Sequence, residues 1–195
     1  MDPTELFFGL CRYYSSLGLD EDITWSSWGQ RTIAYFDQLG RMLGYKVYTE
    51  DTLTSTEDWE CPPSLYLKRI DMTWVYPDRD IYALAMEHQG SNNPRTIRLD
   101  IKKLSIMDCF KVLVVYQQDT DKVQKWIQKE VSRGEGDFVL INIPSYFSDT
   151  TIEKLAARLV SDQGKLIGAG TAEARKESIT GLRFFSNPRW LPRQK

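Results

Sequence analysis

The segment IYALAMEHQ (residues 81–89) follows SLYLKRIDMTWV (residues 64–75) after the turn YPDRD (residues 76–80), and this succession decides the fold. Both flanking segments are rich in apolar and aromatic residues, and the Pro-Asp pair between them favours a turn, so we expect a β-hairpin. Side chains alternate between the two faces of a strand. A turn near residue 78 therefore places Asp71 roughly opposite Glu87 when the register is close to symmetric, on the face that Gln89 shares.

The two facing carboxylates of Asp71 and Glu87 predict a site for a hard divalent cation, because such ions prefer oxygen ligands. Glu87 ends an apolar run that is typical of an interior strand, where a charge usually has a partner or a metal. Gln89 adds a polar group two residues further along. The alternative is that both acids are polar residues of a solvated sheet face.

His88 is the only histidine of the chain, which excludes a His-based catalytic triad or a His-rich metal site. Strand alternation points it away from Glu87, and we interpret it as a structural residue.

The remaining elements follow from apolar periodicity and from Gly, Pro and capping residues. A helix that Ser26 or Ser27 caps is expected before the hairpin, and a near-continuous apolar run after it predicts a strand buried on both faces. Residues 51–63 are expected to form a surface loop, and the basic tail from residue 186 an irregular segment. Helices are predicted over residues 4–17, 26–43, 95–107, 120–133 and 150–160, and further strands over 45–50, 109–117, 138–143 and 179–185.

This order predicts an α/β fold with a mixed central sheet flanked by helices. The 195 residues are expected to form one domain, with 42% apolar and 27% charged residues. The chain has no apolar run of membrane-spanning length, and three widely separated cysteines favour a reducing compartment. We therefore expect a cytoplasmic protein that does not enter a membrane. Its formal net charge of −2 shows no global basic field.

Residues 26–116, about half of the chain, resemble the core of the PD-(D/E)xK nuclease superfamily, the restriction-endonuclease-like fold. That core runs helix, three meandering strands, helix, strand, and residues 117–195 would form a C-terminal α/β extension. Asp71 matches the first acid of the family, and Glu87-His88-Gln89 matches the second motif in an ExQ form. Gln89 replaces the usual lysine, and Ile70 replaces the usual proline before the first acid. Asp37 is a loose match to a helix acid of the family.

The resemblance implies a Mg²⁺- or Mn²⁺-dependent hydrolase that cuts DNA, with Asp71 and Glu87 as metal ligands and Gln89 orienting the attacking water. Gln89 cannot act as a base or supply a positive charge. The missing cation would come from Lys102 or Lys103 in the following helix, as lysine migration in this superfamily implies.

Arg95 and Arg98, on the same helix, are candidate contacts to DNA phosphates, although singly each is typical of a solvated helix face. Lys122, Lys125 and Lys129 are interpreted as a solvated face. The surplus of aromatic residues is compatible with stacked bases, a core or a homodimer.

Two other functions remain open. One is a degenerate nuclease-fold protein that binds nucleic acid or a protein partner without cutting, which the replacement by Gln89 favours. The other is an unrelated α/β binding protein in which the hairpin acids are accidental.

Overall fold

A computed structural model describes residues 2–17, 25–49, 70–90, 93–131, 135–144, 154–176 and 183–192. The predicted loop over residues 51–63 and the hairpin residues before Ile70 lie outside this part of the chain. The described helices are α1 (Pro3–Leu17), α2 (Trp25–Met42), α5 (Pro94–Ser105) and α6 (Thr120–Glu130). The described strands are β1 (Lys46–Thr49), β2 (Met72–Val75), β3 (Tyr82–Gln89), β4 (Phe110–Tyr116), β5 (Phe138–Ile143), β6 (Lys154–Val160), β7 (Leu166–Lys176) and β8 (Arg183–Pro192).

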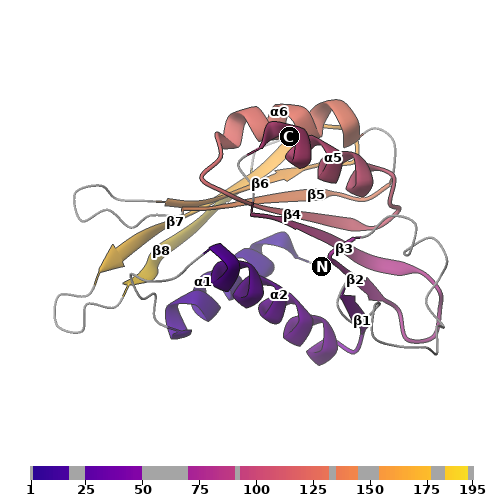
Figure 1. Cartoon of the computed structure of the whole chain (residues 1–195), viewed down its shortest axis with the longest axis horizontal. Helices are drawn as coiled ribbons and strands as arrows, with labels where there is room; N and C mark the ends of the chain where they lie inside the picture. Colours follow the sequence, from indigo (N-terminus) through magenta and orange to yellow (C-terminus); the bar gives the residue numbers. More distant parts are fainter. Residues whose placement is uncertain are drawn as a thin grey trace.

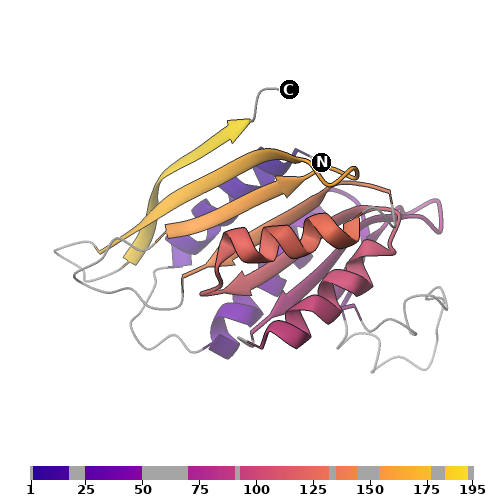
Figure 2. The ribbon, with the colours of Figure 1, turned by 90° about the horizontal axis from the view of Figure 1, so that it is seen from above.

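The strands form one mixed sheet of eight strands in sequence order, β1 to β8. The pairs β3–β4 and β4–β5 are parallel and the other neighbours are antiparallel. Helices α1 and α2 cover one face of the sheet, and α5 and α6 cover the other (Figure 1). Seen from above, α5 and α6 lie side by side over the sheet and run roughly along its strands (Figure 2). The predicted α/β class with a mixed, helix-flanked sheet is confirmed.

The two helices that follow the hairpin begin at strong local signals. Asn93 caps α5 by accepting a hydrogen bond from the backbone N–H of Arg95, and Pro94 occupies the first turn. Asp119 caps α6 by accepting from the backbone N–H groups of Asp121 and Lys122. At α2, by contrast, the helix begins at Trp25, so Ser26 and Ser27 lie inside its first turn and the predicted cap is wrong.

Each face of the sheet has its own apolar core. Trp74, Met86 and Val114 belong to the core under α1 and α2, whereas Ala85 and Leu113 belong to the core under α5 and α6. From Leu84 to His88, even-numbered residues of β3 therefore point toward α2 and odd-numbered residues toward α5. Within the described residues, no helix is both long and apolar enough to cross a bilayer.

The predicted helix over residues 150–160 is wrong, because Lys154–Val160 forms strand β6. Leu155, Ala157 and Leu159 are buried, so the segment alternates with the two-residue period of a strand. Leu, Ala and Arg are good helix formers, but pairing with β5 and β7 on both sides outweighs that preference.

The C-terminal hairpin of β7 and β8 was also missed in part. β7 was not predicted, and β8 continues to Pro192 where an irregular tail was expected. Gly168 and Gly170 weaken the strand signal of β7. The structure shows their use, since a Cβ atom would come within 2.9 Å of the Trp190 ring at Gly168 and within 2.7 Å at Gly170.

Candidate active site

The hairpin register sets the two predicted acids opposite each other. Met72 pairs with Met86 and Thr73 with Ala85. Continuing this register by one residue brings Asp71, which directly precedes β2, opposite Glu87 in β3. The first acid of the site therefore lies at the start of one strand, and the second lies near the end of its antiparallel neighbour.

Lys103 of α5 contacts Glu87 and a further acid of its own helix, Asp100. Its Nζ lies 2.6 Å from Glu87 Oε1 and 3.0 Å from Asp100 Oδ1. Gln89 Nε2 donates a hydrogen bond of 2.6 Å to Asp100 Oδ2. Asp71 Oδ2 accepts a hydrogen bond of 2.7 Å from the backbone N–H of His88. We call Asp71, Glu87, Gln89, Asp100 and Lys103 the acid cluster.

Glu87 is the most constrained member of the acid cluster, with 2% of its surface exposed. Lys103 contacts its Oε1 as an ion pair, but no described donor makes a well-directed hydrogen bond to this oxygen. Burial, followed by the charge of Asp71, raises the pKa of Glu87 from 4.5 to about 9. The acid cluster holds three carboxyl groups and one ammonium, so a proton on Glu87 offsets part of the surplus negative charge.

This raised pKa predicts a pH-dependent stability in metal-free buffer. Between pH 4.5 and about 9 the folded chain keeps a proton on Glu87 that the unfolded chain releases. The stabilisation from this proton is complete below the lower value and is lost as the pH rises through the upper one. Urea denaturation with EDTA at pH 5, 7 and 9 should show wild type losing stability relative to Glu87→Gln as the pH rises. A constant difference between the two proteins would contradict the assignment.

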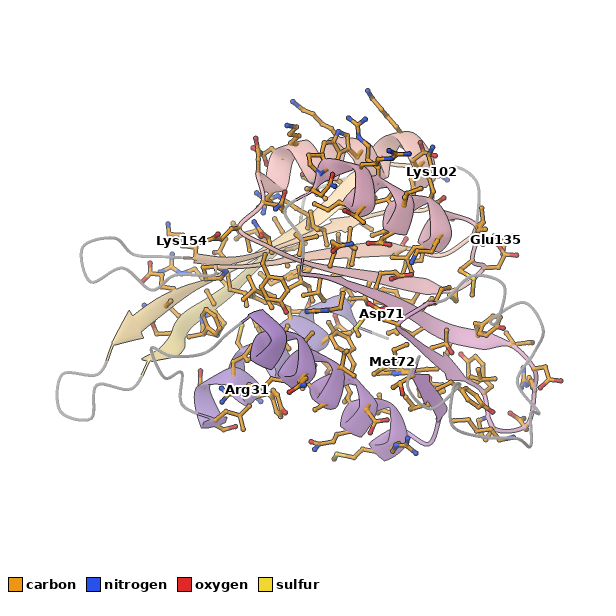
Figure 3. The ribbon with its side chains drawn as sticks, viewed as in Figure 1. Arg31, Asp71, Met72, Lys102, Glu135 and Lys154 are labelled. Atoms are coloured by element: carbon orange, nitrogen blue, oxygen red, sulfur yellow. The ribbon has the colours of Figure 1, made fainter. Side chains whose placement is uncertain are left out.

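Lys102 and Lys103, the two candidate cations, lie on different sides of α5. Lys103 points to the acids, whereas Lys102 is exposed on the outer side of the helix (Figure 3). Arg95 and Arg98 are also exposed, so neither belongs to the acid cluster. Asp37, the loosely matched helix acid, pairs with Arg41 of its own helix at 2.9 Å.

Asp100 is the member of the acid cluster that the sequence reasoning missed. It is 6% exposed and holds both Gln89 and Lys103. A signal was present, because Asp100 lies three residues after Ile97 and four before Leu104, on the buried face of α5. An acid at such a position needs partners in the fold.

His88 points to the opposite face of the sheet, as strand alternation predicted. Its Nε2 lies 2.6 Å from the Tyr116 hydroxyl, which lies 3.3 Å from Thr32 Oγ1, and Tyr14 contacts Thr32 in turn. Burial lowers the pKa of His88 to about 4, so the ring is neutral at physiological pH. This buried chain of polar groups links α1 and α2 to the sheet. In β3, the backbone N–H of His88 also donates the hydrogen bond to Asp71.

The acid cluster contains carboxylate oxygens, the kind of ligand that hard divalent cations prefer. Asp71 and Glu87 offer such oxygens, and the Lys103 ammonium lies 2.6 Å from Glu87 Oε1. No group of three or more His, Cys, Asp or Glu side chains suited to a metal ion occurs within the described ranges. A main-chain carbonyl, such as that of His88, would have to complete the set.

Comparisons of this chain with protein-family models, with curated proteins and with solved structures give no match. Its function is therefore inferred from the geometry of the acid cluster.

Proposed function

We propose that this chain is a metal-dependent nuclease-like protein that hydrolyses phosphodiester bonds in DNA. The observation that carries the proposal is the buried Glu87 carboxylate, registered opposite Asp71 and in contact with the Lys103 ammonium. Two acids at neighbouring strands can hold a metal ion that assists phosphodiester hydrolysis, and a nearby ammonium can stabilise the charge that develops on the phosphate.

The order of elements supports the proposal. Among the described elements, α2 precedes the antiparallel strands β1, β2 and β3, and α5 then leads to β4, which is parallel to β3. The resemblance to the PD-(D/E)xK core implies this same order, with the first acid at the second strand and the second acid on the third. Asp71 and Glu87 occupy those two places.

Asp71 and Glu87 would hold Mg²⁺ or Mn²⁺, with a main-chain carbonyl of β3 as a further ligand. The bound ion supplies Lewis acidity and lowers the pKa of a water molecule. Lys103 replaces the positive charge that Gln89 lacks and stabilises negative charge that develops on the phosphate. Asp100 positions both Lys103 and Gln89 through its two carboxylate oxygens.

Cleavage of plasmid and linear DNA with Mg²⁺ or Mn²⁺ tests the proposal. Wild type should cut, and Asp71→Ala should lose at least about 100-fold in rate, because one of two side-chain ligands is gone. Asp78→Ala, which removes an exposed acid in the hairpin turn, is the matched control and should cut like wild type. Equal cleavage by Asp71→Ala and wild type would refute the proposal.

A degenerate, non-cutting protein is the second candidate. The observation in its favour is that Lys103 already neutralises part of the acid cluster, while Gln89 stands in place of the usual lysine. Calorimetric titration with Mg²⁺ separates the two candidates. A nuclease requires binding that Asp71→Ala weakens, whereas a protein that only binds a partner has no need of a carboxylate-dependent metal site.

A further inference from the structure

A basic groove runs along the seam between α5 and α6, on the outer side of the molecule. Its larger hollow, of about 530 Å³, lies beside the α5 N-terminus at Asn93, and a second hollow of about 210 Å³ continues it. Arg98, Lys102 and Trp126 line both hollows, so the two are parts of one groove. We call the following set the basic groove: Arg95, Arg98, Lys102, Lys122, Lys129 and Trp126.

Helical spacing explains why these side chains converge. Arg95, Arg98 and Lys102 follow one another at three and four residues along α5, and Lys122, Trp126 and Lys129 do so along α6. In each row the first and last residues are seven positions apart, or about 10 Å along the helix. The groove therefore presents two facing rows of cations over a length that matches a few phosphates of one strand.

The five cations of the basic groove have no described acidic partner. None of them makes an ion pair with an acid in the described ranges, although Glu130 lines the far end of the smaller hollow. The net charge of the whole chain is −2, so this concentration of positive charge is local. Such a surface attracts a polyanion.

Trp126 gives the groove an aromatic floor. The Arg98 guanidinium lies 4.6 Å from the centroid of its ring and the Lys122 ammonium lies 5.6 Å from it. Cation–π contacts of this kind hold the two charges in place. Cations around an aromatic ring in an open groove are typical of surfaces that follow a nucleic-acid backbone.

Helix α5 separates the basic groove from the acid cluster. Lys103 and Asp100 point to the sheet, whereas Lys102 and Arg98 face outward. The groove is therefore not the place where a phosphate would meet Asp71 and Glu87. Its position suits a stretch of backbone beyond the bond that is cut.

We propose that the basic groove binds the phosphate backbone of one nucleic-acid strand, outside the acid cluster. This inference deepens the proposed function, since it adds a second contact surface for the same polymer, but it requires no metal and no cleavage. Single strands and duplexes share the chemistry that the groove recognises.

Fluorescence anisotropy with a labelled 20-nucleotide single strand and the matching duplex, in EDTA, tests the inference. The double variant Lys102→Glu/Lys122→Glu should lose at least about tenfold in affinity at low salt. For this double variant, the slope of log K against log salt concentration should be shallower than for wild type, by about 1.4 for the single strand and 1.8 for the duplex. The neutral variant Lys102→Gln/Lys122→Gln should lose less affinity, and its unfolding transition shows whether the fold is intact.

The charge-matched control is Lys46→Glu/Lys154→Glu, which reverses two exposed lysines on β1 and β6 and should lose less than about threefold. Equal losses in the groove and control variants, or no DNA binding by wild type, would overturn the inference. Competition by polyglutamate as strong as that by DNA would also overturn it, in favour of an acidic protein segment. Wild type that binds through the groove without cutting would refute only the proposed hydrolysis. If the groove variant cut and bound DNA like wild type, only the proposed role of the basic groove would be refuted.

Discussion

Lys103→Met should reduce Mg²⁺-dependent DNA cleavage by about 100- to 1,000-fold, the usual cost of removing one group that stabilises transition-state charge. Lys103 is the described cation that contacts Glu87, at 2.6 Å, and Gln89 cannot replace it. The loss should fall on kcat, with little change in KM for DNA, because Lys103 faces the acids rather than the basic groove. Steady-state kinetics on a short duplex gives both constants.

Lys103→Arg keeps the charge in a bulkier group and should recover part of the rate. Lys154→Met, which removes an exposed lysine of β6, should cut like wild type. A Lys103→Met rate within about threefold of wild type would show that Lys103 has no role in the reaction.

Trp74→Ala should lower the free energy of unfolding by about 3–5 kcal/mol, the range for truncating a large aromatic core residue. Trp74 is fully buried in β2, stacks on Tyr45 at 5.5 Å between ring centroids and lies 6.3 Å from Phe36 of α2. Its ring also fills the space beside Gly40, where a Cβ atom would come within 2.7 Å. The substitution therefore opens a cavity between α2 and the strand that follows Asp71.

Urea denaturation measures this loss, with Tyr76→Ala as the control because Tyr76 is 39% exposed at the end of the same strand. The control should lose less than about 1 kcal/mol. If Trp74→Ala lost no more stability than Tyr76→Ala, α2 would not pack on the sheet through Trp74. Because Trp74 is fully buried, its ring is not available to stack on a nucleic-acid base.

Helices and strands were predicted most accurately from the sequence where local signals and burial agree. The buried runs of β4 and β5 and the capped starts of α5 and α6 carry their own signals, and each element was predicted within a few residues. β6 could not be predicted in this way, because its Leu-Ala-Ala-Arg-Leu core favours a helix until β5 and β7 pair with it. β7 was hidden by glycines whose purpose is contact with Trp190, which is distant in sequence.

The candidate site shows the same division. Strand alternation was sufficient to place Asp71 opposite Glu87 and to send His88 to the other face. The sequence did not show whether Lys102 or Lys103 points to the acids. Adjacent residues of a helix point in directions about 100° apart, so the choice depends on which side of α5 faces the sheet. The buried face of α5 decides between the two lysines, because Lys103 contacts Glu87 and Asp100 there. The position of Asp100 on the apolar face of the helix was the sequence signal that was not used.

Asp71 and Glu87 together should bind a divalent cation, which a crystal soaked in Mn²⁺ would show. We expect one anomalous peak at direct-ligand distance, roughly 2–2.5 Å, from a carboxylate oxygen of each residue. A peak should be absent from Asp71→Ala crystals soaked in the same way. Wild-type crystals in which Mn²⁺ binds elsewhere, while Lys103 stays on Glu87, would contradict the claim.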